Sequence, residues 1–331
     1  MAIFNSSKGD FRRFRPLRAS REVRDRHADV RLSPEDFIHP LFVVEGVNAK
    51  EEIASMPGVF RWSIDRLPEV TEELLACGVE KALLFGVIPD RMKDAAGSAG
   101  VAADSLVCRA VRYIKERFPQ VTVFTDVCLC EYVPHGHCGV LSGGEVDNDA
   151  TLPLLAEMAF RHAAAGADFV APSAMADGQV SVIRQRLTRE GLPAKILAYS
   201  AKYASGFYGP FRDAAGSAPA FGDRSGYQMD YRTVGQGMEE IAADIEEGAD
   251  WVMVKPALPY LDVVQRASAR FPGHPLAAYQ VSGEYSMLKQ GAASGFFNEE
   301  RIFAECLTAI KRAGARYLIS YYTPKRGSGY S

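Results

Sequence analysis

The sequence predicts a (β/α)8 TIM barrel, and three observations support this fold class. Eight short apolar runs, each typical of a strand buried on both faces, follow one another along the 331 residues. Stretches with helical spacing separate most of these runs, as the βαβ units of a parallel sheet require. No G-x-G-x-x-G motif follows the first run, which argues against an open dinucleotide-binding sheet. Eight alternating units fit a closed barrel better than a doubly wound sheet.

Four of the predicted strands share one local pattern, in which a helical stretch ends at a glycine and an apolar strand starts shortly afterwards. The glycine suits the left-handed C′ position that follows a helix. These segments are ACGVEKALLFGV (76–87), AAGADFVAPS (164–173), EEGADWVMVKP (246–256) and RAGARYLISYY (312–322). The other predicted strands lie in HPLFVVEG (39–46), VTVFTDVC (121–128), AKILAYSAK (194–202) and HPLAAYQVSG (274–283). Predicted helices include DSLVCRAVRYIKERF (104–118) and LPLLAEMAFRHAAA (152–165).

The composition is that of a globular protein without a nucleic-acid or membrane partner. Apolar residues make up 47% of the chain, and the formal net charge is −3. No apolar run approaches the roughly 18 residues that span a bilayer. The first residues contain no apolar h-region, so we expect no secretory signal. Six cysteines in such a chain indicate reduced thiols rather than a disulfide framework, and hence a cytoplasmic location.

Two segments interrupt the alternation of strands and helices. Residues 1–34 are rich in arginine, and we expect an extended arm that packs on a neighbouring subunit, with a frayed basic terminus as the alternative. Residues 35–331 then form the catalytic barrel. Within the barrel, residues 203–233 are rich in glycine, proline and aromatic residues without a clear period. Structureless segments of this length are usually lids or binding loops, so we expect an active-site lid.

Two lysines stand directly after apolar runs, at the carboxyl ends of strands where a barrel places its catalytic groups. They are Lys202 in LAYSAK and Lys255 in WVMVK. Either lysine alone would most simply be solvated. Together at one face, burial and mutual repulsion would lower a lysine pKa and yield a neutral amine that forms a Schiff base with a ketone. Asp126, at another strand end, is a candidate for orienting a lysine or handling a proton, with a structural carboxylate as the alternative.

Other polar side chains near the predicted site suit an acidic substrate. Arg212 and Arg224 lie among aromatic residues in the lid, and arginine pairs with carboxylates through two charge-assisted hydrogen bonds. Ser282 and Tyr321 offer hydroxyl groups at the barrel rim that would suit a second carboxylate. Ordinary surface arginines are the alternative interpretation of the first pair.

Three cysteines cluster in DVCLCEYVPHGHCG (126–139), on the loop after the third predicted strand. Structural zinc sites generally use four ligands, whereas three protein ligands with an open position are typical of catalytic zinc. Cys128, Cys130 and Cys138 therefore predict a catalytic Zn²⁺ that polarises a carbonyl or activates water. His135 or His137 as a fourth, closing ligand is the alternative. A redox pair is disfavoured because C-x-C lacks the C-x2-C spacing of thioredoxin-like sites.

Several long motifs, in order, resemble the porphobilinogen synthase (5-aminolevulinate dehydratase) family, zinc-dependent branch. The similar segments are DVCLCEYVPHGHCG, YSAKYASGFYGPFRDAAGSAPAFGDR, MVKPALPYLD, YQVSGEY and YYTP, with RLSPEDFIHPLFVVEG and SMPGVFRWSID before them. The resemblance covers nearly the whole chain. It implies a lyase that condenses two 5-aminolevulinate molecules to porphobilinogen, with loss of two waters, in tetrapyrrole and heme synthesis.

The resemblance also implies roles for individual residues. Lys255 would form the principal Schiff base, and Lys202 would bind the other substrate or assist proton transfer. One substrate carboxylate would be held by the lid side chains, which are Arg212, Arg224 and Gln228. Ser282 and Tyr321 would hold the other carboxylate, and the three cysteines would hold zinc.

Further implications of the resemblance concern regulation and assembly. Glu240, fifteen residues before Lys255, matches the ligand of an allosteric Mg²⁺ in bacterial members, although an acid-rich helix surface is the simpler alternative. The family is commonly a homo-octamer in which the N-terminal arm embraces a neighbour. Ala174 and Gln179 depart from the family's usual aspartate and arginine, which puts subunit contacts and a magnesium response in doubt. The rival interpretations are a Schiff-base aldolase that acts on one keto acid and a non-catalytic zinc-binding protein.

Overall fold

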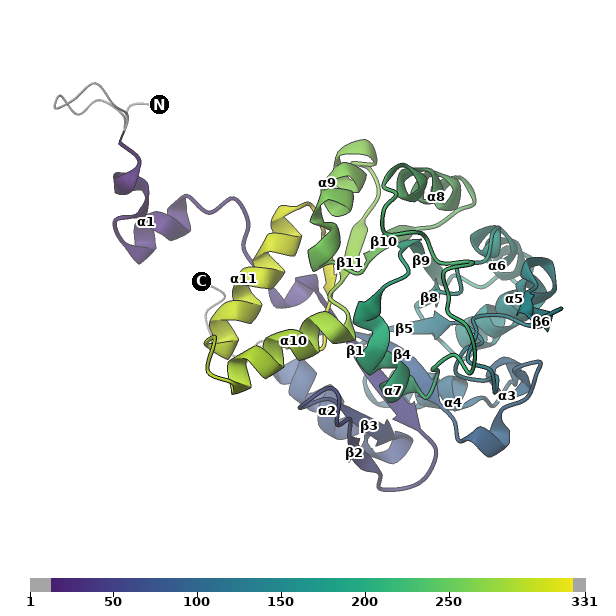
Figure 1. Ribbon diagram of the computed structural model, residues 1–331. Coiled ribbons are helices and arrows are strands. Elements are labelled where there is room, and N and C mark those ends of the chain that lie inside the picture. Colours follow the sequence, from purple (N-terminus) through teal and green to yellow (C-terminus); the bar gives the residue numbers. More distant parts are fainter. Residues whose placement is uncertain (1–12, 324–331) are drawn as a thin grey trace.

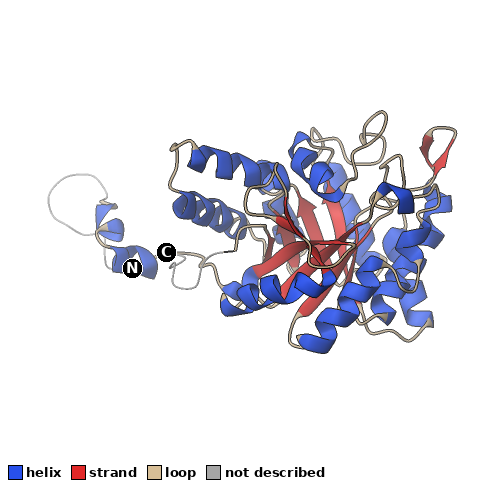
Figure 2. Cartoon of the chain, turned by 90° about the horizontal axis from the view of Figure 1, so that it is seen from below, coloured by secondary structure: helices blue, strands red, loops and turns tan. Residues whose placement is uncertain are grey.

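The computed structural model of the protein describes residues 13–323, and its core is a closed barrel of parallel strands surrounded by helices (Figures 1 and 2). The barrel strands are β1 (Phe37–Val44), β4 (Lys81–Val87), β5 (Thr122–Val127), β8 (Phe169–Pro172), β9 (Lys195–Lys202), β10 (Trp251–Lys255), β11 (Leu276–Tyr279) and β12 (Tyr317–Ile319). Each strand pairs with the next in this order, and Phe37 and Ile38 of β1 close the ring by pairing with β12. The predicted TIM barrel is confirmed.

Helices cover the outside of the barrel between successive strands (Figure 1). The longer ones are α2 (Leu67–Ala76), α4 (Leu106–Arg117), α5 (Asn148–Ala164), α6 (Gln179–Arg189), α8 (Gly235–Glu246), α9 (Leu261–Arg270), α10 (Ser282–Ala293) and α11 (Glu299–Arg312). The shorter ones are α1 (Arg21–Arg26), α3 (Ser98–Val101) and α7 (Gly209–Ala215). Turns of 3-10 helix lie at Arg15–Arg18, Pro34–Asp36, Ile64–Arg66, Asp90–Met92, Gly206–Tyr208 and Leu258–Tyr260. No helix in residues 13–323 combines the length and apolarity needed to cross a bilayer.

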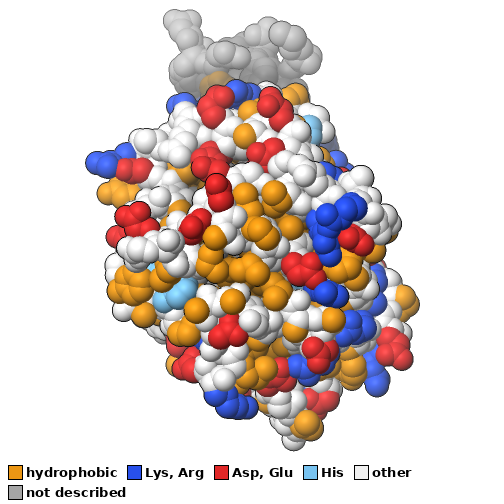
Figure 3. Space-filling view, turned by 90° about the vertical axis from the view of Figure 1, so that its right-hand side faces the viewer, with side chains coloured by type: hydrophobic (Ala, Val, Ile, Leu, Met, Phe, Trp, Pro, Cys, Tyr) orange, Lys and Arg blue, Asp and Glu red, His pale blue; other side chains and the backbone are white. Residues whose placement is uncertain are grey.

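Two pairs of short strands lie outside the ring, and only the first pair is hydrogen-bonded to it. β3 (Phe60–Ser63) runs parallel to the last residues of β1, and β2 (Lys50–Glu52) pairs antiparallel with β3. β6 (Leu141–Ser142) and β7 (Glu145–Val146) form a separate hairpin after the cysteine loop. On the face over α5 and α6, hydrophobic side chains gather near the centre among charged groups of both signs (Figure 3).

Glycine sets the junction between helix and strand at four places, as the sequence predicts. Gly78, Gly166, Gly248 and Gly314 all have positive φ, from +81° to +121°, at the C′ position of the preceding helix. In each case the strand begins three residues later. A side chain at these positions would strain the backbone, because L-residues rarely adopt such angles. These junctions therefore start β4, β8, β10 and β12 in the same way.

Aromatic rings fill the end of the barrel where these strands begin. Phe169, Trp251 and Tyr317 each open a strand, three residues after one of the glycines. Trp251 stacks on Tyr317 with ring centroids 4.0 Å apart and lies 4.6 Å from Phe169, which stacks on Phe124 at 4.3 Å. We call these four residues the aromatic floor. Because catalytic groups of a TIM barrel lie at the opposite end, the floor contributes to stability rather than chemistry.

Within the described part of the N-terminal arm, residues 13–34, the helix α1 stands away from the barrel, whereas Leu32 is buried in the core (Figure 1). The helix α1 buries none of its residues, although Ser20 caps its start by accepting a hydrogen bond from the backbone N–H of Val23. Residues 1–12 of the predicted arm, and residues 324–331 of the predicted catalytic domain, lie outside the described residues. The assignment of 1–34 as an oligomerisation arm therefore stays a prediction.

Replacing Trp251 by alanine is predicted to lower the free energy of unfolding by about 2–4 kcal/mol. The substitution removes the contacts of the Trp251 ring with its aromatic neighbours and leaves a cavity in the aromatic floor. Denaturant unfolding of the variant checks this value. Phe296→Ala is the matched control, since that ring is 77% exposed. Activity per folded molecule is expected to stay unchanged in both variants, and a selective loss of activity in the Trp251 variant would contradict the assignment of the floor.

Candidate active site

The two predicted lysines lie side by side at the carboxyl ends of adjacent strands. Lys202 ends β9, Lys255 ends β10, and their Cα atoms are partners in the pairing of these parallel strands. Partners in adjacent strands direct their side chains to the same face of a sheet. Both side chains enter the barrel mouth and are only 5% exposed. The structure therefore brings together the two amines that the sequence placed at strand ends.

An irregularity in β9 makes this pairing possible. Ala198 pairs with Val252, whereas Lys202 pairs with Lys255. Between these two pairs, β9 therefore contains one residue more than β10. An extra residue of this kind is a β-bulge, and a shift by one residue turns the following side chains to the other face. The bulge falls beside Tyr199 and thereby directs Lys202 into the site.

Lys255 is enclosed by aromatic rings. Its Nζ lies 4.2 Å from the ring centroid of Tyr279, 5.0 Å from Tyr199, 5.3 Å from Phe211 and 5.4 Å from Tyr208. We call these four rings the aromatic cage. Burial, with repulsion from Lys202, lowers the pKa of Lys255 to about 7. A large fraction of the amine is therefore neutral near pH 7, while the ring faces can still stabilise a cationic nitrogen.

Asp126 lies within the same charge network. Lys202 Nζ donates a hydrogen bond to the carbonyl oxygen of Ser173, and Ser173 Oγ donates to Asp126 Oδ2 at 3.1 Å. Asp126 Oδ1 is buried without a hydrogen-bond partner among the described residues. Burial raises the pKa of Asp126 to about 6, and the two lysines oppose that rise. Asp126 is thus placed to accept a proton or a hydrogen bond from a bound molecule, and this role remains a prediction.

The three clustered cysteines fit a soft divalent metal. Cys128, Cys130 and Cys138 are all buried, and their Sγ atoms lie within 4.8 Å of one another, with Cys128 and Cys130 3.3 Å apart. Zinc–sulfur bonds of about 2.3 Å in tetrahedral geometry require sulfur atoms about 3.8 Å apart, so small movements would suffice. Hydrogen bonds from Cys128 and Cys130 hold the pKa of Cys138 well below its usual value. Burial raises the pKa of the Cys128 thiol, and contacts with the neighbouring thiols raise that of Cys130, so Cys138 is the thiol of the three that loses its proton most readily.

The two histidines of the motif contact the lid instead of the cysteines. The ring nitrogens of His137 lie 3.2 Å from Tyr227 Oη and 3.1 Å from the carbonyl oxygen of Phe221. Neither His137 nor His135 belongs to the potential metal-binding groups found among residues 13–323. The structure thus disfavours the alternative of a histidine as the fourth ligand, whereas Asp126 and Glu131 form a second potential metal-binding group with Cys128.

A carboxylate that the sequence reasoning missed lies next to the cysteines. Glu131 Oε2 accepts a hydrogen bond from Cys130 at 3.2 Å, while Oε1 is buried without a partner in the described part of the chain. Burial, with repulsion from Asp126, raises the pKa of Glu131 to about 8. Its position directly after C-x-C was the available signal. The spacing alone did not reveal that the side chain turns inward.

The lid supplies the predicted arginines and the glutamine. Arg212 lies in α7, and Arg212, Arg224 and Gln228 line one cavity of about 1100 Å³. Arg224 is held by the carbonyl oxygens of Gly136 and Ser217, at 2.8 and 2.7 Å. Both amide atoms of Gln228 are buried without partners among the described residues. Orphaned buried polar atoms of this kind are usually satisfied by water or a ligand.

The two rim hydroxyls have different surroundings. Ser282 Oγ accepts a hydrogen bond from the backbone N–H of Phe211 at 2.9 Å and donates to the carbonyl oxygen of Phe207 at 3.2 Å, so it fastens the lid to the start of α10. Tyr321 Oη lies 2.9 Å from Tyr279 Oη, one ring of the aromatic cage. Both residues therefore border the lysine site, and their predicted contact with a carboxylate remains untested.

Glu284 is a second residue that the sequence reasoning missed. Its fully buried carboxylate accepts backbone N–H bonds from Ala257 at 3.2 Å, Leu258 at 2.6 Å and Val281 at 2.7 Å. Two of these donors follow Lys255 and the third precedes Ser282. Glu284 thus ties together the two strand ends that carry these side chains. The motif QVSGEY contained it, but only tertiary structure identifies its partners.

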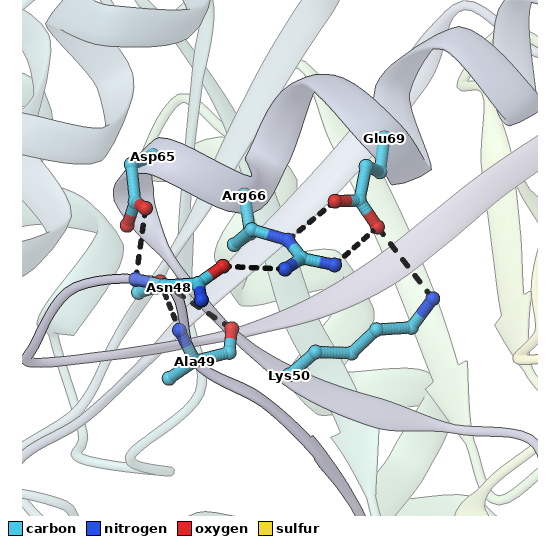
Figure 4. A network of polar contacts seen from close by, with 7 residues as sticks. Asn48, Ala49, Lys50, Asp65, Arg66 and Glu69 are labelled. Carbon is cyan, nitrogen blue, oxygen red and sulfur yellow. Dashed lines mark hydrogen bonds and ion pairs between the residues drawn. The ribbon is translucent and has the colours of Figure 1, made fainter.

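A network of polar contacts joins the segment at the start of β2 to the turn after β3 and the start of α2. Arg66 donates a hydrogen bond to Asn48 Oδ1 at 2.6 Å and forms an ion pair with Glu69 (Figure 4). Glu69 also lies 3.6 Å from Lys50 Nζ. Asp65 accepts a hydrogen bond from the backbone N–H of Asn48. These contacts fix the segment that leads to Arg61.

Arg61 of β3 in turn fastens the lid helix. Its guanidinium donates to the carbonyl oxygens of Asp213 and Ala214, both at 2.8 Å. The predicted lid is therefore not structureless: α7 gives it a rigid, anchored segment.

Glu240 lies apart from the lysines, on α8 at the outside of the barrel. It lines cavities together with Asp177, and burial raises its pKa, with further repulsion from Asp177 and Glu247. Gln236 donates a hydrogen bond to it at 3.2 Å. This acidic surface would suit a hydrated divalent cation, and one of its two cavities is also lined by Tyr199 of the aromatic cage.

Comparison with known proteins identifies the family. Residues 11–327 match the family model of delta-aminolevulinic acid dehydratase. The chain belongs to the delta-aminolevulinic acid dehydratase family. It is 47% identical to the delta-aminolevulinic acid dehydratase of Bacillus subtilis over 313 residues, which is 94% of this chain and 96% of that protein. It is 49% identical to that of Streptomyces coelicolor over 319 residues, which is 95% of this chain and 96% of the relative.

A solved structure of the same family confirms the fold. The delta-aminolevulinic acid dehydratase of Toxoplasma gondii, in complex with the reaction product porphobilinogen, superposes with a TM-score of 0.91 at 41% identity. The alignment covers 94% of this chain and 89% of that one. Family membership therefore extends over the barrel and the lid alike.

The environment of Lys255 predicts how its reactivity depends on pH. The neutral amine is the nucleophile, so covalent trapping of a keto acid by borohydride should rise with pH through about 7 and level off above it. Lys202→Met should move the midpoint upward, because a neighbouring cation no longer disfavours the protonated form. Mass spectrometry of the trapped peptide, recorded against pH, checks both. A wild-type midpoint near 10 would contradict the buried environment.

Proposed function

We propose that this protein is a porphobilinogen synthase, a hydro-lyase that condenses two molecules of 5-aminolevulinate to porphobilinogen with loss of two waters in tetrapyrrole synthesis. The observation that carries the proposal is the register pairing of Lys202 with Lys255 beside the three-cysteine cluster. One substrate ketone can react with an amine while a second is held next to it. Holding both substrates together makes a difficult assembly effectively unimolecular, which lowers the barrier by up to about 7–11 kcal/mol.

Lys255 is proposed as the principal nucleophile. Its neutral nitrogen adds to the substrate ketone, and loss of water gives an imine whose nitrogen carries positive charge when protonated. The aromatic cage excludes water and stabilises that charge, with Tyr279 nearest at 4.2 Å. Glu284 acts through the backbone by fixing the strand end that follows Lys255. Lys202 would bind the second substrate or carry a proton, with Asp126 as its acceptor.

Each substrate also carries a carboxylate, and the site offers a place for both. Arg212, Arg224 and Gln228 of the lid are proposed to hold one of them. Ser282 and Tyr321 are proposed to hold the other at the rim. Ser282 bonds the lid in the present structure, so we expect its hydroxyl to exchange that contact for the substrate.

Cys128, Cys130 and Cys138 are proposed to hold a catalytic zinc ion. When bound, zinc supplies Lewis-acid polarisation of an oxygen or acidifies a bound water. The residues around it then hold and move protons, with the unpartnered oxygens of Asp126 and Glu131 as acceptors. Reduced thiols that bind metal are consistent with a cytoplasmic setting.

A chelator-stripped sample tests the proposal directly. Without metal we expect little porphobilinogen from 5-aminolevulinate, with activity restored by zinc, because the thiol site would then polarise the second substrate. Cys130→Ser should lower kcat at least about 100-fold. Cys306→Ser, a half-buried thiol outside the cluster, is the control. Full activity in the stripped enzyme would overturn the role of zinc. Absence of product under every condition would overturn the function.

Glu240 is proposed as the ligand of an activating Mg²⁺. Added magnesium should then raise the activity of the zinc-loaded enzyme, and Glu240→Gln should abolish that increase while zinc dependence persists. Asp262→Asn, another surface acid on a neighbouring helix, is the control. An equal response to magnesium in all three proteins would exclude Glu240.

The arm is proposed to hold subunits together in a homo-octamer. Leu17 and Val23 are partly buried in a segment that stands away from its own barrel, which leaves apolar surface for a neighbour. Introducing a charge with Leu17→Asp and Val23→Asp should reduce the assembly, because burying an unpaired carboxylate is costly. Analytical ultracentrifugation checks this. Val47→Asp, at a position that is 84% exposed on the barrel, is the control. An unchanged mass would reject the arm as the contact.

A further inference from the structure

A second cavity leads from the surface to the cysteine cluster. It has a volume of about 430 Å³ and lies behind the lid residues 225–230. Its lining runs from exposed residues such as Asp177, Ser225 and Gln236 to the buried Cys138. Lys202 and Lys255 do not line it. One cysteine of the proposed zinc site, Cys138, therefore borders a cavity that the two lysines do not line.

The charged residues in the lining of this cavity are all acidic. They are Asp177, Asp230 and Glu240, and no lysine or arginine belongs to the lining. Asp230 is paired with Arg232, whose Nε lies 3.0 Å from both carboxylate oxygens, so its charge is largely compensated. Asp177 and Glu240 remain as the two carboxylates that give the entrance a negative potential.

One buried side chain of the cavity lining has polar atoms without hydrogen-bond partners among the described residues. Gln228 lines both this cavity and the cavity of Arg212 and Arg224, and it is only 3% exposed, yet neither of its amide atoms has a hydrogen-bond partner within residues 13–323. Ala174, which also belongs to the lining, is 4% exposed and has a small side chain. A hydrated cation that enters here meets oxygen ligands first and sulfur last.

The cavity on the other side of the lid has a different character. It contains Arg212 and the buried Arg224, which suit the carboxylates of a substrate, together with Arg232 and three aspartates. The lid segment thus separates a cavity with charged residues of both signs from a cavity whose charged residues are all carboxylates. Only the second cavity attracts a cation without an opposing arginine in its lining.

We propose that the acidic cavity is the passage by which a divalent cation reaches Cys128, Cys130 and Cys138. This inference rests on the proposed metal site, but it concerns the route to the site rather than the reaction. Asp177 and Glu240 raise the local concentration of cations at the entrance, and the passage delivers them to Cys138. Carboxylates of substrates use the other side of the lid.

Stopped-flow measurement of Co²⁺ binding to the chelator-stripped protein tests whether the carboxylates of Asp177 and Glu240 speed the arrival of the cation. Thiolate-to-cobalt absorption reports arrival at the cysteines without any activity measurement. Asp177→Asn with Glu240→Gln should slow association about 10-fold at low ionic strength, where steering is effective. At about 1 M salt the Debye length falls to about 3 Å and the difference should nearly vanish. The final absorption should match wild type. Glu239→Gln is the control, because that carboxylate pairs with Arg270 and does not line the passage.

A steric variant tests the path independently of charge. Ala174→Leu should slow both association and dissociation of Co²⁺ at every salt concentration, since the larger side chain narrows the passage, while the ratio of the two rates stays constant. Circular dichroism verifies that the barrel remains folded. Wild-type rates of Co²⁺ binding in both the charge variant and the steric variant would overturn the proposed passage. They would not affect the proposal that the three cysteines bind metal. Absence of thiolate absorption in the wild type would overturn both proposals.

Discussion

The arrangement of this site depends on the pairing of two buried lysines across adjacent strands. Two ammonium groups this close, and this far from water, cannot both stay charged at low cost. The neighbouring groups reduce this cost in a different way for each lysine. Burial of Lys255 favours its neutral form, whereas Lys202 donates to the carbonyl oxygen of Ser173 and lies near Asp126. The asymmetry between the two amines follows from these neighbours, and an asymmetric condensation needs it.

The lid links the proposed substrate-binding residues to the environment of Lys255. Phe211 and Arg212 are consecutive residues of α7: the first forms one wall of the aromatic cage, and the second lines the cavity that we propose to hold a carboxylate. Ser282 and Arg61 hold the same helix from two sides. Movement of α7 would therefore change the polarity around Lys255 and the position of the guanidinium together.

Much of this architecture could be predicted from the sequence because it depends on local rules. Helix-ending glycines such as Gly166, and apolar runs that end in Lys202 or Lys255, are signals carried by a few neighbouring residues. The bulge in β9 was not predictable, since it is a property of how two distant strands pair. Glu131 and Glu284 were missed for the same reason: their importance comes from burial and from partners remote in the chain. The rigid helix within the lid was hidden by its many glycines and prolines.

The four helix-ending glycines have a consequence for the symmetry of the molecule. They precede the second, fourth, sixth and eighth strands around the barrel, and each strand starts at the same offset from its glycine. The residues at those starts, Lys81, Phe169, Trp251 and Tyr317, occupy equivalent positions in alternate strands, and Lys81 Nζ approaches the Tyr317 ring at 5.7 Å. At the end where its strands begin, the barrel thus repeats one two-strand module four times. The mouth breaks that repeat, since only one adjacent pair of strands there ends in lysine.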